Sequence, residues 1–377
     1  MARQGSQAIA ETRSGRDELV SRLLIDCDIH HRIVPTELMK RLPKRWGARF
    51  EGFGLTPNST ALGGYTRPRR DAAMSNSWPS DGYPGSDREF LTSQLLDRWG
   101  HTYAILNPID QTAFQPQRGE YAAALVRAIN DWTREEWLDK DKRFYASIAV
   151  PFEDSDLAVD EVAKCAPNPR FIQVLANVIT ESPVGNRKYW PIYEAAAHYG
   201  LPLALHVGGG SGHPKSSAGW PSTCFEDHAG YAYAFVAQVT SLIAEGVFQR
   251  FPALKVVLQE GGFAWMPALM WRMDRAYELL VESIGPLEKL PSQYCREHLW
   301  FTTQPIEEPE HPRDFMTVVR DLDMDDRLLF ATDYPHWDFD APDRAIPSVV
   351  PAELRAKIFA DNALALYDRL PRPVPAV

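Results

Sequence analysis

The sequence lacks the features that mark several common classes of protein. Its four cysteines are far apart and form no Cys-x-x-Cys pair, so we expect reduced thiols and a cytoplasmic location rather than a disulfide framework. The first 22 residues carry charges throughout and contain no continuous apolar stretch. We therefore expect neither a secretory signal nor a membrane span there, and predict a loose N-terminal tail or an arm to a neighbouring subunit.

Basic residues are also too few for a protein that binds nucleic acid. The chain has 40 lysines and arginines against 50 aspartates and glutamates, a formal net charge of −10. Phosphate backbones require a clustered basic surface, so we expect no nucleic-acid partner and instead a small-molecule substrate. No glycine-rich phosphate turn follows the first strand, and the GGG at 208–210 lacks the spacing of a dinucleotide fingerprint, so we expect no nucleotide cofactor.

Eight apolar runs predict β-strands, and amphipathic helical patterns lie between them. The runs are residues 23–30, 103–108, 144–151, 171–176, 201–208, 255–261, 299–304 and 328–335. Continuously apolar strands that alternate with helices are typical of a parallel sheet covered by helices. Eight repeats favour a (β/α)₈ TIM barrel over a doubly wound open sheet, and we predict one barrel domain over residues 1–377.

Residues 46–85 interrupt this alternation. They are rich in Gly, Pro, Trp, Arg and Ser, and we predict a long inserted loop that acts as a lid, partly ordered by Trp78 and Tyr83. Arg67 and Arg70 are candidates to bind a substrate carboxylate, because a guanidinium matches a carboxylate with two parallel hydrogen bonds. The alternative is that these arginines are solvated or contact a neighbouring subunit.

Metal-binding side chains occur within three of the apolar runs. Asp28 and His30 are two residues apart on one strand, so their side chains point to the same side. His206 and Asp333 occur near the ends of two later runs. A divalent metal that keeps a position open is typically held by three or four such ligands, and burying these groups without one would be costly. The pattern predicts a metal-centred pocket at the carboxyl ends of the strands.

The motifs IDCDIHHRIVP, HVGGG, FPALKVVLQEGGFAWMPALMWRMDR and ATDYPHWD resemble, as a set, those of the amidohydrolase superfamily. Within it they resemble the amidohydrolase-related group of metal-dependent hydrolases and aromatic-acid decarboxylases, over nearly the whole chain. The resemblance implies a (β/α)₈ barrel with one metal ligated by Asp28, His30, His206 and Asp333, and an assembly of two or more copies. Asp28 replaces the commoner His. Zinc is the expected metal, and the two carboxylates admit manganese or iron.

The resemblance also implies further site residues. Many relatives carry an acid–base His after strand six, and Glu260 occupies that position here. A carboxylate can do this work if burial or Asp333 raises its pKa, and the alternative is a structural role as a ligand orienter or helix cap. Asp333 is a candidate base as well as a ligand, and His336 is a candidate to orient it or contact substrate. His213 and His228 are reserve candidates for the missing imidazole and for substrate binding, together with Trp78.

We therefore predict a metal-dependent hydrolase that acts on a small organic or aromatic acid, amide or lactone through metal-activated water. Hydrolysis is preferred because a carboxylate pair can activate water and the strand-six His is not evident. The first alternative is non-oxidative decarboxylation of an aromatic or unsaturated acid. A barrel that has lost catalysis and only binds ligands, and a metal-independent lactonase, stay open as well. His31 points to the opposite face from His30, and we expect it to contribute to packing or to support the ligands.

Overall fold

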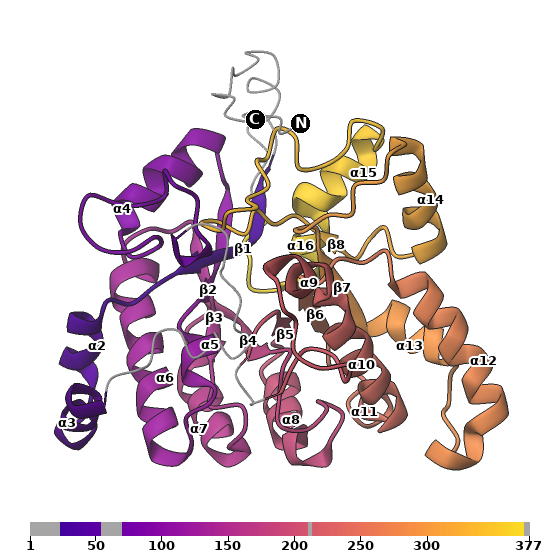
Figure 1. Cartoon of the computed structure of the whole chain (residues 1–377), viewed down its shortest axis with the longest axis horizontal. Helices are drawn as coiled ribbons and strands as arrows, with labels where there is room; N and C mark the ends of the chain where they lie inside the picture. Colours follow the sequence, from indigo (N-terminus) through magenta and orange to yellow (C-terminus); the bar gives the residue numbers. More distant parts are fainter. Residues whose placement is uncertain (1–22, 54–69, 210–212, 373–377) are drawn as a thin grey trace.

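The computed structural model of the protein describes residues 23–53, 70–209 and 213–372. Eight parallel strands follow one another in the sheet in chain order. They are β1 (Ile25–His31), β2 (Tyr103–Pro108), β3 (Phe144–Ala149), β4 (Phe171–Asn177), β5 (Leu203–His206), β6 (Val256–Gln259), β7 (Leu299–Thr302) and β8 (Leu328–Leu329). Each lies in or overlaps one of the predicted runs, and the predicted (β/α)₈ barrel is confirmed (Figure 1).

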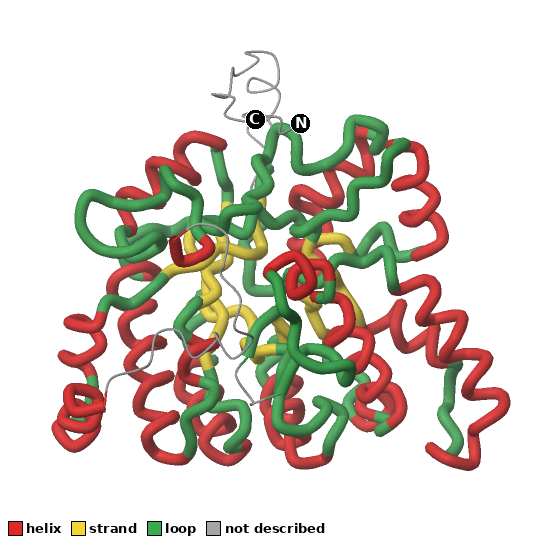
Figure 2. Tube along the Cα trace, in the orientation of Figure 1, coloured by secondary structure: helices red, strands yellow, loops and turns green. Residues whose placement is uncertain are grey.

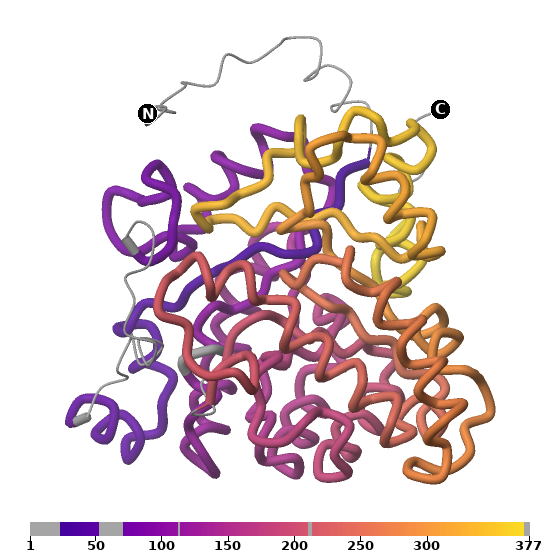
Figure 3. The backbone as a smooth tube through the Cα atoms, turned by 45° about the vertical axis from the view of Figure 1, so that its right-hand side comes forward, coloured from indigo at the N-terminus to yellow at the C-terminus, as the bar shows by residue number. Residues whose placement is uncertain are grey.

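Backbone hydrogen bonds bring the end of the sheet back to its beginning. The Cys27 N–H donates to the carbonyl of Phe330 at 2.9 Å, and the Asp333 N–H donates to the carbonyl of Asp28 at 3.1 Å. Ile29 and Tyr334 form a parallel bridge. In Figure 3 the indigo chain of β1 accordingly runs beside the gold chain that follows β8. The segment after β8 therefore nearly closes the sheet into a barrel.

Helices surround the strands, as Figure 2 shows in red around yellow. The α-helices are α2 (Pro35–Arg41), α3 (Lys44–Phe53), α4 (Arg88–Leu91), α5 (Gln111–Phe114), α6 (Gly119–Thr133), α7 (Ser155–Cys165), α8 (Trp190–His198), α9 (Cys224–Ala229), α10 (Tyr231–Ala244), α11 (Val247–Arg250), α12 (Met266–Ile284), α13 (Pro291–His298), α14 (Pro312–Leu322), α15 (Ala352–Ala356) and α16 (Asn362–Leu366). Short helical turns are η2 (Arg70–Ala72), η3 (Thr92–Asp97), η4 (Arg134–Leu138), η5 (Arg187–Tyr189) and η6 (Lys357–Asp361). Among the described helices, none is long and apolar enough to cross a membrane.

The apolar core has two parts. The larger part fills the layer between strands and helices, where one face of each amphipathic helix is buried. The smaller part joins strand residues such as Ile25, Cys27 and Val257 to Leu366 and Tyr367 in and just after α16. Because Ile25 and Val257 lie at the beginnings of their strands, the C-terminal segment covers the amino-terminal end of the barrel. The carboxyl-terminal end is left for the polar residues.

The predicted loop over residues 46–85 is wrong at its beginning, because Lys44–Phe53 form the helix α3. Trp46 and Phe50 are one helical turn apart and pack against the core, which is a helical pattern that the glycines of the segment obscured. Residues 54–69, including Arg67, and the predicted N-terminal tail lie outside the described residues.

Residues 70–85 lie against the carboxyl end of β1 and the loop after β8. The Met74 N–H donates to the carbonyl of Pro335 at 2.9 Å, and the Arg32 N–H donates to the carbonyl of Gly85 at 3.0 Å. Gly85 has φ +79°, and a Cβ there would lie 2.5 Å from the carbonyl oxygen of His30, so only glycine allows this approach. The segment is therefore built into the wall of the site.

Candidate metal centre

Five buried side chains converge at the carboxyl end of the barrel. Asp28 and His30 lie on β1, His206 ends β5, Glu260 directly follows β6, and Asp333 lies in the segment after β8. Ligand atoms of Asp28, His30 and His206 lie within 4.8 Å of one another, and the same limit holds for His30, Glu260, Asp333 and His336. The structure therefore brings together all four ligands expected from the sequence, and Glu260 with them.

Each of the five side chains has one buried polar atom without a hydrogen-bond partner. These atoms are Asp28 Oδ2, His30 Nε2, His206 Nε2, Glu260 Oε2 and Asp333 Oδ2. His206 Nε2 lies 3.3 Å from both Asp28 Oδ2 and Glu260 Oε2. Unpartnered buried polar atoms are costly, and imidazole nitrogens with carboxylate oxygens are the donors that divalent metals accept. The donor set fits one divalent cation.

Backbone carbonyls fix the orientation of both imidazoles. His30 Nδ1 lies 3.1 Å from the carbonyl oxygen of Asn107, and His206 Nδ1 lies 2.6 Å from that of Val207. A carbonyl only accepts, so each Nδ1 carries a hydrogen, and Nε2 of each ring is the atom that can bind a cation. Asn107 also donates from Nδ2 to Asp28 Oδ1 at 2.7 Å, so one residue on β2 supports two candidate ligands.

Asp333 is linked to the mouth of the barrel through His336. Its Oδ1 accepts a hydrogen bond from His336 Nδ1 at 2.7 Å, and the His336 side chain is 15% exposed whereas that of Asp333 is fully buried. The backbone is strained here, with φ 56° at Asp333 and 62° at Glu260. Hydrogen bonds hold this conformation: the N–H of Glu260, for example, donates to Thr302 Oγ1 at 3.0 Å. Such strain is characteristic of functional sites.

The crowded charges shift the pKa values of the group. Burial and the negative charge of Asp333 raise the pKa of Glu260 well above its usual value. Burial works against ionisation of Asp333 too, but His336 and His30 hold its pKa well below the usual range. Burial also opposes charge on His30, yet the carboxylates of Asp28 and Asp333 raise its pKa to about 9. A cation that binds His30 Nε2 must therefore displace a proton.

His228 lies at the mouth with an acidic partner that sequence reasoning missed. Its Nε2 is 2.8 Å from Asp338 Oδ2, and Gln304 Nε2 donates to the same oxygen at 3.1 Å. The ring of His228 lies 4.8 Å from that of Tyr231 and 5.4 Å from that of Trp337. Its side chain is 27% exposed. The pair is thus partly open to a ligand, and no spacing in the sequence indicates it, because the two residues are 110 positions apart.

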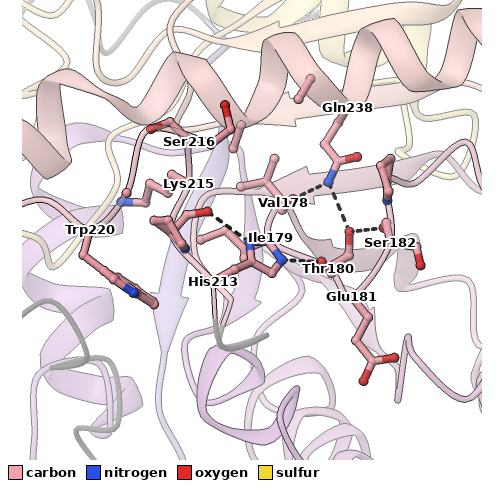
Figure 4. A pocket seen from close by; sticks show the side chains of 16 residues that line it. Val178, Ile179, Thr180, Glu181, Ser182, His213, Lys215, Ser216, Trp220 and Gln238 are labelled. Carbon is pink, nitrogen blue, oxygen red and sulfur yellow. Dashed lines mark hydrogen bonds between the residues drawn. The ribbon is translucent and has the colours of Figure 1, made fainter.

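His213 lies in a side pocket and is not among the groups of metal-binding side chains. The pocket has a volume of about 470 Å³ and lies between the loops after β4 and β5 and helix α10 (Figure 4). His213 Nδ1 is 3.0 Å from the carbonyl oxygen of Pro214, and Nε2 is 2.7 Å from that of Thr180. Thr180 lies in the loop after β4 and His213 in the loop after β5, so the contact between them ties the two loops together. Trp220 stands at the edge of the pocket, 47% exposed.

The other predicted residues are placed as follows. Arg70 begins η2, and Trp78 is partly buried in the segment beside β1. The ring of His31 is stacked on Trp132 with centroids 5.3 Å apart, and its Nε2 lies 2.6 Å from Thr133 Oγ1. The expected packing role of His31 is confirmed. None of the four cysteines, all of which lie in the described residues, forms a disulfide.

Comparisons with known proteins agree with this barrel. A family model described as amidohydrolase matches residues 25–369. A γ-resorcylate decarboxylase of a Polaromonas strain is 26% identical over 296 residues, which cover 73% of this chain and 85% of that protein.

Two solved structures share the fold. One is a 5-carboxyvanillate decarboxylase of Novosphingobium aromaticivorans in complex with manganese and 4-hydroxy-3-methoxy-5-nitrobenzoic acid, with a TM-score of 0.67, 19% identity, and coverage of 93% of this chain and 97% of that one. The other is an amidohydrolase of Mycobacterium avium subsp. paratuberculosis, with a TM-score of 0.68, 22% identity, and coverage of 92% and 99%. Both show the same arrangement of the chain.

Proposed function

Because this chain belongs to the amidohydrolase family, we propose that it is a metal-dependent enzyme that removes the carboxylate of a hydroxylated aromatic acid without an oxidant. The observation that carries the proposal is the set of five buried, unpartnered donor atoms at the carboxyl end of the barrel. Relatives named as decarboxylases of aromatic acids support this reaction. They favour decarboxylation, the first alternative in the sequence analysis, over hydrolysis.

We propose that Asp28, His30, His206 and Asp333 hold one divalent metal. Manganese replaces zinc as the first choice, because half of these ligands are carboxylates and the 5-carboxyvanillate decarboxylase has manganese bound. The bound metal would hold the substrate carboxylate and a neighbouring hydroxyl and neutralise their charge.

We propose that the proton for the reaction comes from His336 and is relayed by Asp333, whose low pKa keeps it ionised beforehand. The ring carbon that bears the carboxylate gains a proton, and the bond to the carboxylate then breaks with its electron pair returning to the ring, which releases CO₂ and the phenol. His336 Nδ1 donates to Asp333 Oδ1 at 2.7 Å, while Asp333 Oδ2 is the unpartnered oxygen. The exposed side of His336 can take up the next proton from solvent.

Glu260 is proposed to act as a neutral acid in place of the imidazole of relatives. Burial and the negative charge of Asp333 raise its pKa well above the usual value, which favours the protonated form. Its Oε2 faces the centre beside His206. A neutral Glu260 limits the negative charge that an anionic substrate would meet, and it can donate a hydrogen bond to a substrate oxygen.

Substrate selection is assigned to the mouth of the barrel. His228, held by Asp338, is proposed to contact a polar group on the far side of the aromatic ring, and Trp78 to contact the ring itself. Arg67 and Arg70 stay predicted carboxylate partners, and His213 stays a predicted substrate contact. The predicted assembly of two or more copies likewise stays a prediction.

The test is an assay of manganese-loaded protein with γ-resorcylate, 5-carboxyvanillate and salicylate, with CO₂ and the phenol measured together. In D₂O the product should carry one deuterium at the carbon that lost the carboxylate. Chelation of the metal should stop turnover, and Asp333→Asn should abolish it. CO₂ release that survives chelation would contradict the metal mechanism.

Hydrolysis is kept as a second candidate on one observation, the presence of Glu260 as a second carboxylate beside His206 and Asp333. Such a pair can accept a proton from an attacking water. A parallel panel of anilides, esters and lactones decides the matter. Cleavage of one of these, with no CO₂ from any acid, would replace the decarboxylase proposal. Manganese binding without turnover of either panel would favour a barrel that only binds ligands.

A further inference from the structure

A continuous row of hydrogen bonds joins Asp28 to the C-terminal segment of the chain. The hydroxyl of Tyr367 donates to Gln173 Oε1 at 2.7 Å, and Gln173 Nε2 donates to Ser147 Oγ at 2.8 Å. Ser147 Oγ donates to Asn107 Oδ1, and Asn107 Nδ2 donates to Asp28 Oδ1 at 2.7 Å. The row thus passes from the end of α16 through β4, β3 and β2 to β1.

The charge of Asp28 dictates the direction of every bond in this row. An ionised carboxylate only accepts, so Asn107 must present its amide NH₂ and turn its oxygen toward Ser147. Ser147 must then donate to that oxygen and accept from the NH₂ of Gln173. The oxygen of Gln173 is left facing Tyr367, whose hydroxyl must donate. A second, longer contact of 3.5 Å from Gln173 Nε2 to Asn107 Oδ1 agrees with the same orientation.

The row is enclosed by the barrel along its whole length. All five side chains are buried to at least 99%, so no solvent competes for these bonds. Aligned hydrogen bonds in a medium of low polarity reinforce one another, and a buried donor or acceptor that loses its partner costs about 1–3 kcal/mol. The orientation of each member therefore depends on its neighbours.

We propose that Tyr367 is a positioning residue for the metal ligand Asp28, acting through Gln173, Ser147 and Asn107; this rests on the metal centre proposed above. The row holds Asp28 Oδ1 with a fixed donor and leaves Oδ2 as the oxygen offered to the metal. The carbonyl of Asn107 at the same time holds His30 Nδ1. The C-terminal segment thus reaches the ligand Asp28 through the row, from the opposite end of the barrel.

A purely structural role for the row makes a different prediction. If it only satisfies buried polar groups, cutting it lowers the stability of the metal-free protein and leaves the affinity for metal unchanged. Positioning of Asp28 requires that the affinity for metal falls. The two roles are separated by measuring metal affinity and metal-free stability on the same variants.

The experiment is calorimetric titration of metal-free protein with Mn²⁺, for wild type and Tyr367→Phe. This change removes only the terminal donor, and we expect about tenfold weaker binding at unchanged stoichiometry, the lower end of the range for residues that support a ligand from behind. Tyr145→Phe is the matched control, because Tyr145 lies in the same apolar cluster and outside the row. Its Mn²⁺ affinity should equal that of wild type.

Ser147→Ala provides a second cut in the row. It should weaken Mn²⁺ binding by a similar factor, and the double variant Tyr367→Phe/Ser147→Ala should lose little more than the stronger single change, because both cut one row. Wild-type affinity in Tyr367→Phe would overturn the inference, whatever the result for Ser147→Ala, as would fully additive losses in the double variant. If the wild type binds Mn²⁺ but shows no turnover, the proposed reaction is wrong, and the inference about Tyr367 is unaffected. A wild type that binds no divalent metal would overturn both.

Discussion

The two faces of strand β1 place adjacent histidines in opposite chemical environments. His30 faces the centre, where Asp28 and Asp333 raise its pKa to about 9 against the effect of burial. His31 faces the helices, where burial and the positive charge of His30 lower its pKa to about 3. Both residues are at least 98% buried. Burial alone therefore does not decide the charge of a histidine, and the difference lies in the partners that each ring meets.

The partners also decide what each ring is available to do. His31 stacks on Trp132 and meets Thr133 through Nε2, so that nitrogen is already occupied. His30 has its Nδ1 held by Asn107 and its Nε2 left without a hydrogen bond. One face of the strand thus contributes to packing and the other presents an unsatisfied donor atom to a cation. Three changes test this contrast, in order of decreasing effect.

Asp333→Asn should have the largest effect, because it removes a carboxylate that raises the pKa of His30. Asparagine tolerates the φ of 56° found here, so the backbone can stay as it is. We expect kcat for decarboxylation to fall by about 10²–10⁴-fold, the usual contribution of a positioned acid or base. Asp321→Asn on the surface of α14 is the control and should behave as wild type. A kcat within a few-fold of wild type would remove Asp333 from the mechanism.

His30→Ala should weaken metal binding, whereas the same change at His31 should not. We expect at least about 100-fold weaker Mn²⁺ binding, beyond the loss expected for a residue that only supports a ligand. His31→Ala deletes the neighbouring ring on the other face and should lose stability while keeping Mn²⁺ affinity within a few-fold of wild type. Titration calorimetry on the two metal-free variants measures the difference. Equal losses of affinity would show that the two faces do not act separately.

His31→Phe should have the smallest effect, visible in stability against pH. A histidine whose pKa falls from about 6.5 unfolded to about 3 folded stabilises the fold fully above pH 6.5 and loses that contribution as the pH falls toward 3. At pH 5 the loss is about 2 kcal/mol. Phe can keep the stacking on Trp132 but cannot form the hydrogen bond with Thr133 Oγ1. The loss of this bond lowers the free energy of unfolding by about 1 kcal/mol.

The order of stability should therefore reverse between these two proteins. Wild type should be more stable at pH 7.5 and the variant at pH 5, in urea unfolding of metal-free protein. Burial is the larger cause of the low pKa of His31 and the positive charge of His30 is the second, so both proteins are compared without metal to keep the neighbouring centre the same. If the free energies of unfolding of the two proteins differ by the same amount at pH 5 and pH 7.5, His31 is protonated in the folded chain with little cost.

Much of this arrangement follows from the sequence, because strand periodicity is a local property. Each apolar run contains or overlaps a strand, and polar residues at its carboxyl end meet wherever parallel strands form a barrel. Asp28, His30, His206 and Asp333 were found in this way. Their neighbour Glu260 came from the resemblance of the motif around it. These residues could be predicted from the sequence because each lies directly on or beside a strand.

The remaining features depend on contacts between distant segments. The helix Lys44–Phe53 was missed because its glycines resemble a loop, whereas packing of Trp46 and Phe50 decides its structure. Asp338 and Tyr367 carry no local signal, since their roles come from His228 and from Gln173, far away in the chain. Spacing within one segment contains no information about such pairs.

The closure of the barrel also sets the order of events during synthesis. The hydroxyl of Thr332 donates to Asp26, a residue 306 positions earlier, and Asp333 next to it completes the group around His30. A nascent chain on the ribosome therefore exposes Asp28 and His30 long before their last companion has been made. The proposed metal can be held in its final geometry only after both β1 and the segment after β8 have left the ribosome.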